Sequence, residues 1–334
     1  MKRKLKKVRK RKESELTMLF LFILSKENIS FAKAELESLL GKEVKTEKNI
    51  AFAQCKNRDF SRLAMTRQAN QILFSCNINE LEKQIEKFAW NRFYENDFYL
   101  STINIPKKFS KKYFADIIYN QLNQPRVKIK NPSTVFELIF INEMVYATKR
   151  LWLNTDDFKL RKAHKRKEHH PTSIHPKLAK ALVNLTGIRK GKIIDPCCGS
   201  GGILIEAGLM GLKPIGRDID KIMLSRAKIN LESFGITDFE LKLKDVRHLE
   251  KYTYLVTDLP YGLASKITDK QNFYLDFLQI LSKKLNKRAV VVFPGFFDYK
   301  KVICKLPLKI ISEFNWFVHK NMTRNIVILE PRSH

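Results

Sequence analysis

The sequence predicts an α/β protein in two parts: a doubly wound sheet with a terminal antiparallel hairpin in the C-terminal half, and a smaller α+β region before it. After Pro171 the chain alternates short apolar strands with amphipathic helices, and a glycine-rich turn follows the first of these strands. Strict alternation of this kind is typical of parallel strands joined by helices. The region before residue 150 instead mixes strands, helices and a hairpin.

The C-terminal part, residues 171–334, has local signals for each expected element. Its first helix begins with Pro176 in the first turn, and Gly187 stands just past its end. Strands are expected at 192–194, 214–216, 240–243, 255–257 and 289–293, and helices at 176–186, 202–210, 221–234 and 272–285. Two apolar runs at 309–318 and 325–329 predict the closing hairpin.

The N-terminal part divides into three segments by composition. Residues 1–15 are expected to form a basic arm that is disordered when free, and residues 151–170 a basic linker. Between them, residues 16–150 predict strands at 18–24, 50–55 and 98–105, helices at 29–40, 59–75, 81–90 and 113–122, and a hairpin from 134–141 and 144–148.

Charge is the dominant feature of the composition. The chain has 63 Lys+Arg against 34 Asp+Glu, a net charge of +29, and 33 Phe and Tyr in total, from 23 and 10. A basic surface with aromatic residues favours a nucleic-acid partner over simple solubility. The longest early apolar run, Met18–Leu24, is too short for a membrane span, so a soluble protein is expected. Five cysteines without a Cys-x-x-Cys pair predict a reduced, cytoplasmic protein without a zinc site.

Small and acidic residues follow the first three expected strands of the C-terminal part. The turn at 193–202 reads IIDPCCGSGG, which lets backbone N–H groups approach a ligand closely. Asp218 can accept from both hydroxyls of a ribose, and Asp245 from an adenine amino group while the Val246 N–H donates to the ring. Taken alone, Asp218 fits a helix N-cap equally well, with Asp220 the better cap, and Asp245 fits a turn. Their order together predicts a bound nucleoside cofactor.

The fourth expected strand leads into the sequence DLPYG at 258–262. Asp258 and the backbone carbonyl of Leu259 can accept the two N–H bonds of an exocyclic amine, which aligns the nitrogen lone pair with an incoming methyl group. Pro260 keeps the turn rigid, and Tyr261 can stack on a planar base. The loop resembles the (Asp/Asn)-Pro-Pro-(Tyr/Phe) loop of class I, Rossmann-like methyltransferases that act on amino groups.

Further motifs narrow the resemblance. HPTSIHPKLA at 170–179, the turn with its continuation to Ala207, GRDID at 216–220 and HKNMTR at 319–324 resemble segments of the THUMP-domain tRNA guanosine N2-methyltransferases, closest to the archaeal-type tRNA (guanine-10-N2) methyltransferases. The segment 62–67 resembles a helix of the THUMP region. Leu259 stands where the family usually has Pro, and Cys197-Cys198 where it usually has Phe-Cys.

The resemblance implies S-adenosylmethionine as the cofactor and N2 methylation of tRNA guanosine 10, once or twice. It also implies that a ferredoxin-like and THUMP region at 16–150 holds the acceptor end of the tRNA, and it allows for a small accessory protein. The catalytic candidates are Asp258, Leu259, Pro260 and Tyr261. The cofactor-binding candidates are Asp195, Cys197, Gly199, Gly201, Asp218, Ile219, Asp245 and Val246, and no metal ligand is expected.

Four alternatives stay open at this point. The same loop serves adenine N6 and glutamine amides, although the basic N-terminal half disfavours a protein substrate. Guanosine 6 of tRNA competes with guanosine 10, because sister enzymes share both domains. A non-catalytic RNA-binding subunit on a methyltransferase scaffold is disfavoured by the intact Asp218, Asp258 and Tyr261.

Overall fold

The computed structural model describes residues 18–56, 59–170, 173–260, 270–319 and 322–332. Contacts divide the chain into two compact units. The first comprises residues 1–29, 44–61 and 66–154, and the second comprises 30–43, 62–65 and 155–334. Among the described residues, no helix is both long and apolar enough to cross a membrane.

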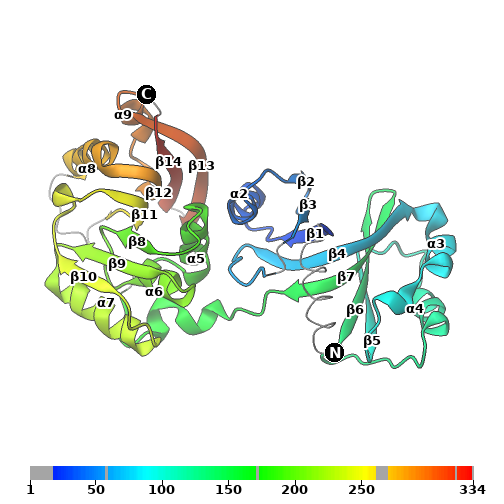
Figure 1. Cartoon of the computed structure of the whole chain (residues 1–334). Helices are drawn as coiled ribbons and strands as arrows, with labels where there is room; N and C mark the ends of the chain where they lie inside the picture. Colours follow the sequence, from blue (N-terminus) through cyan, green and yellow to red (C-terminus); the bar gives the residue numbers. More distant parts are fainter. Residues whose placement is uncertain (1–17, 57–58, 171–172, 261–269, 320–321, 333–334) are drawn as a thin grey trace, which may run out of the picture. The chain divides into compact units, whose positions relative to one another are not determined.

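The first unit is built on a mixed seven-stranded sheet (Figure 1). Its strands lie in the order β2 (Lys45–Glu47), β3 (Ile50–Cys55), β1 (Met18–Leu24), β4 (Thr66–Asn77), β7 (Met144–Leu153), β6 (Thr134–Ile141) and β5 (Phe98–Ile103). Only β5 and β6 pair in parallel. Helices α3 (Leu81–Lys87) and α4 (Lys111–Gln121) pack on this sheet through a core that includes Trp90, Phe114 and Phe136. The unit is therefore α+β, as its mixed order predicts.

One predicted helix in this region is wrong. The sequence predicts a helix over 59–75 and a match to a family helix at 62–67, but β4 begins at Thr66 and runs to Asn77. It lies between β1 and β7 and pairs with both. Its polar residues Gln68 and Asn70 are buried, and their side-chain amides donate hydrogen bonds to Glu137 of β6, which compensates for the loss of contact with water. Pairing on both sides outweighs local helical spacing.

The second unit has the predicted doubly wound sheet. Its strand order is β10 (Glu240–Leu243), β9 (Lys213–Asp218), β8 (Lys192–Asp195), β11 (Tyr252–Asp258), β12 (Leu285–Pro294), β14 (Met322–Pro331) and β13 (Leu308–His319). The first five strands are parallel, and β14 pairs antiparallel with both β12 and β13. The expected fold class, including the terminal hairpin, is confirmed.

Helices cover both faces of this sheet (Figure 1). Phe277 and Leu281 of α8 (Lys270–Lys284) pack in one core with β11 and β12. Leu204 of α6 (Gly202–Leu209) and Leu231 of α7 (Lys221–Ser233) belong to a separate core. Two further helices are α5 (Pro176–Leu185) and the five-residue α9 (Tyr299–Ile303), which is too short to show a helical period in the sequence.

The expected linker differs from the structure. Strand β7 continues to Leu153, and residues from 155 onward belong to the second unit. Arg161 binds Asp156 at 2.7 Å and Glu206 of α6 at 2.7 Å. Arg166 is 5% exposed and lies over Gly202, where an added Cβ would come within 3.1 Å of its guanidinium. Two arginines of this basic segment are therefore packed against α6, which a count of charges along the sequence does not reveal.

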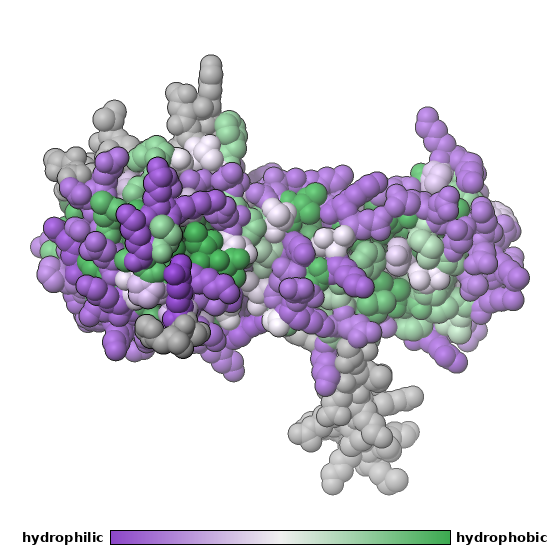
Figure 2. Space-filling view, turned by 90° about the horizontal axis from the view of Figure 1, so that it is seen from above, coloured by the Kyte–Doolittle hydropathy of each residue, from purple (hydrophilic) through white to green (hydrophobic). Residues whose placement is uncertain are grey.

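Helix α2 (Ile29–Leu40) also groups with the second unit, although the sequence places it in the N-terminal region. The ring of Phe31 meets Phe314 and Trp316 of β13 edge-on, each with ring centroids 5.2 Å apart. Hydrophilic side chains cover most of the face seen in Figure 2, as the composition leads one to expect.

Candidate active site

Three carboxylates of the second unit end neighbouring parallel strands. Asp195 is the last residue of β8, Asp218 of β9 and Asp258 of β11. Because parallel strands end at the same edge of a sheet, these side chains gather at the carboxyl edge, where doubly wound proteins bind their ligands. Asp245 follows β10 and caps a 3-10 turn at Val246–His248.

The glycine turn connects this edge to α6. Gly199 and Gly201 have φ angles of 50° and 85°, a left-handed conformation that is costly for other residues. The Gly199 N–H donates to Asp218 at 2.8 Å, which ties the turn to the end of β9. A Cβ added to Gly199 would meet nothing within 4 Å, so open space lies beside the turn. The turn therefore presents bare backbone toward room for a ligand.

Asp195 is buried beneath the turn, with 2% of its surface exposed. Its Oδ1 accepts from the Thr257 hydroxyl at 2.7 Å and from the Cys197 N–H at 3.1 Å. Burial, together with the nearby charges of Asp218 and Asp258, raises the pKa of this carboxyl to about 7. Burial likewise raises the pKa of the Cys197 thiol, which keeps it a neutral packing group. Both side chains therefore shape the turn from below.

Asp218 and Asp245 present carboxylates in different surroundings. Asp218 also accepts from the Asp220 N–H at 2.9 Å, and partial burial raises its pKa. Asp220 itself caps α7, as expected, by accepting from Ile222. Arg247 binds Asp245 through both side-chain oxygens and lowers its pKa. An adenine amino group at Asp245 therefore has to share the carboxylate with Arg247.

Two smaller cofactor candidates occupy opposite environments. Ile219, directly after β9, is 52% exposed, so its side chain is open to a ligand. Val246 is buried in the core under α8. Only the backbone of Val246 is therefore suited to contact an adenine ring, which is the role that the sequence predicts for it.

The predicted catalytic loop begins where β11 ends. The Leu259 N–H donates to the Val292 carbonyl at 3.1 Å, and its side chain is completely buried. Leu259 thus fills the core where the family usually has Pro. The hydroxyl of Tyr274 in α8 donates to the Pro260 carbonyl at 2.7 Å, and burial raises the pKa of Tyr274 to about 12. Tyr261 lies outside the described residues.

Three residues at this site were absent from the predicted set. Thr257 and Tyr274 are a strand residue and an apolar helix-face residue, and neither position carries a signal in the sequence. Arg324 of β14 lies 3.2 Å from the Asp258 carboxylate. It ends the sequence HKNMTR at 319–324, whose resemblance to the family pointed to this position without indicating its role.

Contacts on the other side of the turn hold it in place. The Ser173 and Ser200 hydroxyls lie 2.9 Å apart. Asn230 of α7 donates to the backbone carbonyls of Ser200 at 3.0 Å and Glu168 at 2.7 Å. Residues that precede α5 are therefore anchored beside the glycine turn, where the family-like HPTSIHPKLA segment begins.

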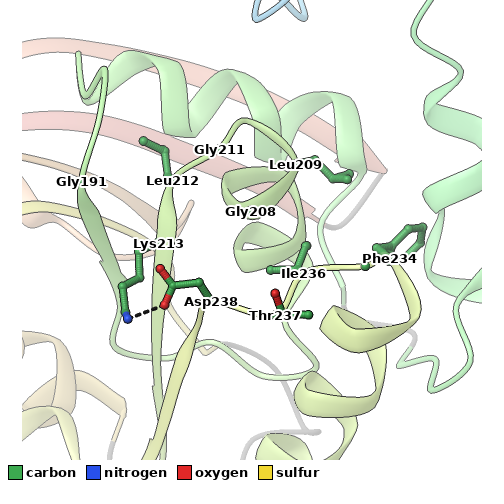
Figure 3. Close-up of a pocket in the computed structure, with 11 residues that line it drawn as sticks. Gly191, Gly208, Leu209, Gly211, Leu212, Lys213, Phe234, Ile236, Thr237 and Asp238 are labelled. Carbon is green, nitrogen blue, oxygen red and sulfur yellow. Dashed lines mark hydrogen bonds and ion pairs between the residues drawn. The ribbon is translucent and has the colours of Figure 1, made fainter.

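A surface hollow of about 560 Å³ lies at the opposite end of the strands (Figure 3). Its lining includes Gly191, just before β8, and Lys213, which begins β9 and forms an ion pair with Asp238. It is thus at the amino edge of the sheet and contains none of the predicted site residues. Among the described residues, no cluster of three or more potential metal ligands is present.

Two family profiles match the chain, and both describe methyltransferases. An RMKL-like methyltransferase domain matches residues 163–324, and a DNA methylase matches residues 18–228. The first range runs from the residues packed on α6 to Arg324. It therefore includes the whole carboxyl-edge site.

Two archaeal relatives that match much of the chain have the same name. The tRNA (guanine(10)-N2)-dimethyltransferase of Methanothermobacter thermautotrophicus is 28% identical over 94% of this chain and 99% of its own length. That of Pyrococcus abyssi is 34% identical over 66% of this chain and 69% of its own. Among solved structures, TrmN from Thermus thermophilus aligns with a TM-score of 0.53 at 16% identity, over 94% of this chain and 99% of that one. A likeness at that identity shows the fold alone.

Fold, site and profiles together define an S-adenosylmethionine-dependent methyltransferase. The open glycine turn and the partly exposed Asp218 suit such a nucleoside cofactor. The relatives give the family: the chain belongs to the tRNA (guanine(10)-N2)-dimethyltransferases. The predicted enzyme class and family are confirmed.

Proposed function

We propose that this enzyme transfers methyl groups from S-adenosylmethionine to the exocyclic N2 of guanosine 10 in tRNA. The observation that carries this proposal is Asp258, a carboxylate at the carboxyl edge of the sheet, in a chain whose relatives are named for this reaction. A second methylation at the same nitrogen is part of the proposal, because the relatives are named dimethyltransferases.

Asp258 and Leu259 act on the amine in this proposal. The amine of guanine is a weak nucleophile because its lone pair is delocalised into the ring. The Asp258 carboxylate and the Leu259 carbonyl accept its two N–H bonds, which turns the lone pair toward the methyl donor. The carboxylate also stabilises the positive charge that develops on nitrogen. Tyr274 holds the loop through the Pro260 carbonyl, and Tyr261 is proposed to stack on the base.

The glycine turn and its neighbours would hold the cofactor. Asp218 accepts from the ribose hydroxyls, Asp245 and the Val246 backbone take the adenine, and Ile219 packs on its face. Gly199 and Gly201 provide the close backbone approach, while Asp195 and Cys197 keep the turn in shape from beneath. When bound, S-adenosylmethionine would supply a methyl group on a sulfonium, and the neutral thioether S-adenosylhomocysteine would be the leaving group.

The first unit is proposed to bind the tRNA as a THUMP-containing region. Net charge of +29 supports a polyanionic partner. A guanine in a paired arm has to be flipped out of its stack before its amine can reach Asp258. Recognition then rests on tRNA shape and backbone contacts more than on base sequence. Five free cysteines fit a reducing cytoplasm, where tRNA is processed.

Methyl transfer to unmodified tRNA transcripts tests this function directly. With labelled S-adenosylmethionine, we expect label on N2 of guanosine 10, mapped by nuclease digestion and mass spectrometry. Asp258→Ala should lower turnover by about 100-fold or more and leave cofactor affinity nearly unchanged. Asp238→Ala, at the opposite edge of the sheet, is the matched control and should retain full activity.

The product decides between the alternatives. Label at guanosine 6 would keep the chemistry and correct the position. Label on adenine or on protein would contradict the proposed substrate. Full turnover by Asp258→Ala would remove Asp258 from its catalytic role.

A further inference from the structure

The catalytic carboxylate is half of a buried ion pair. Asp258 Oδ2 lies 3.2 Å from Arg324 Nη2, and the two side chains are 14% and 9% exposed. The strands that carry them are not adjacent, because β12 lies between β11 and β14. In register, Asp258 aligns with Val292, whereas Arg324 aligns with Pro294. The guanidinium therefore reaches across the end of β12 to the carboxylate.

Local backbone geometry holds Arg324 at this edge. The Gly295 N–H donates to the Thr323 carbonyl at 2.9 Å. A Cβ at Gly295 would lie only 3.0 Å from that same oxygen, so a larger residue would push the start of β14 away. Because Arg324 follows Thr323 directly, the bare backbone of Gly295 helps to fix where its side chain begins.

The pair combines acceptors and donors in one place. A carboxylate has about four lone-pair positions and a guanidinium has five N–H donors, so their mutual contact uses only part of either. Guanine presents N2–H and N1–H donors next to the O6 acceptor along one edge. The amino-substituted edge of adenine presents one N–H donor beside an acceptor nitrogen. Two carboxylate oxygens flanked by a guanidinium donor therefore complement guanine, whereas adenine would set its acceptor nitrogen against a carboxylate oxygen.

We propose that Arg324 determines the specificity of this site for guanine: while Asp258 accepts from N2–H and N1–H, the Arg324 guanidinium donates to O6. This inference rests on the proposed function and adds the group that selects the base. Arg324 also orients Asp258 through their ion pair. Arg324 contacts O6 of the base, whereas Asp258 contacts the amine that is methylated and the N1–H beside it.

A base analogue separates base selection from catalysis. The substrate is a tRNA assembled by ligation with either guanosine or 2,6-diaminopurine riboside at the methylated position. The analogue keeps the 2-amino group but replaces O6 with an amine and loses the N1 proton. We expect wild-type kcat/KM to favour guanosine by about 100-fold or more, since a site built for hydrogen bonds rejects mismatched analogues strongly.

The variant Arg324→Gln should reduce this preference by a factor of about 5 to 150, the usual discrimination of one good side-chain contact to a base. Arg324→Lys keeps the charge without the planar fork and should give an intermediate preference. Arg288→Gln is the matched control, because Arg288 of β12 pairs with Glu330 of β14 at 2.6 Å, away from the catalytic loop. It should leave the preference unchanged. Differences in base flipping between the two tRNAs cancel when preferences of variants are compared.

Two results would overturn the inference while leaving the function intact. One is a wild-type enzyme that methylates both substrates equally well. This test does not depend on whether any variant folds. The other is an Arg324→Gln enzyme that loses activity on both substrates in equal proportion, which would make Arg324 a positioning residue only. A wild-type enzyme that methylates no guanosine in tRNA would instead contradict the proposed function.

Discussion

At the scale of residues, the carboxylates of the candidate active site differ in pKa because their surroundings differ. Asp195 is enclosed and, within the described residues, accepts from one hydroxyl and one backbone N–H, so burial dominates and its pKa rises to about 7. Asp245 is partly exposed and paired with Arg247, which lowers its pKa. The sequence predicted both as members of one site. Their protonation depends on neighbours that only the fold supplies.

The buried Asp195 makes stability depend on pH. Its carboxyl binds a proton more tightly in the folded chain than in the unfolded chain, so stability should fall as pH rises from about 4 to about 7. Asp195→Asn keeps an oxygen for Thr257 and Cys197 but cannot ionise. In the wild type we expect the free energy of unfolding to fall by on the order of 2–4 kcal/mol between these pH values, and in Asp195→Asn we expect it to stay nearly constant. Urea denaturation of the cofactor-free protein at several pH values measures both.

Asp245→Asn serves as the comparison for this pH series. Because Arg247 lowers the pKa of Asp245, the contribution of Asp245 to folding stability is lost as pH falls. The contribution of Asp195 is instead lost as pH rises. The decrease between pH 4 and 7 should therefore persist in Asp245→Asn. If Asp195→Asn shows the same pH dependence as the wild type, Asp195 is not the group responsible.

At the scale of elements, α2 shows how a helix is assigned by its contacts. Glu35 is completely buried and accepts from the Ala64 N–H at 2.8 Å, the Met65 N–H at 2.7 Å and the Asn184 amide at 2.7 Å. Burial raises the pKa of Glu35, whereas these three donors lower it. The carboxylate thus joins α2, the segment 62–65 and α5 within the second unit. The amphipathic pattern of α2 predicted its bounds but not this polar anchor.

Removal of the Glu35 carboxylate should destabilise the second unit. Glu35→Ala leaves two backbone N–H groups and the Asn184 amide without their acceptor in a buried place, and we expect a loss of about 2–4 kcal/mol in free energy of unfolding. Urea denaturation of the full chain measures it. Glu37→Ala, on the same helix in a partly exposed pair with Lys33, should cost less than about 1 kcal/mol. Equal effects of the two variants would contradict the anchoring role of Glu35.

At the scale of the whole molecule, charge and packing divide the basic residues into two groups. Arg161, Arg166 and Arg217 are buried or paired inside the second unit, so they contribute little to a surface for RNA. Nine basic residues lie within residues 2–12, where the sequence contains no acidic residue. We therefore expect this arm to contribute more to tRNA capture than an equal number of basic residues in the folded units.

Replacement of these nine residues by glutamine should weaken tRNA binding without changing the methylated product. Each phosphate that the arm neutralises adds about 0.9 to the slope of log Kd against log salt. If each of the nine residues contacts one phosphate, the variant should lower this slope by about 8, and by less if fewer of them do. Binding at a series of salt concentrations measures this slope. Unchanged affinity at low salt would show that the arm is not part of the RNA footprint.

Local patterns in the sequence were enough to predict the doubly wound fold, the glycine turn and the acidic residues at the strand ends. A strand, a turn and a helix follow one another within a few residues there, and parallel strands bring their ends to one edge wherever the sheet forms. Tertiary contacts were needed to show that β4 is a strand, that Glu35 meets Asn184 and that Arg324 faces Asp258. Each of these depends on strand register and on burial between residues far apart in the chain, which no local pattern encodes.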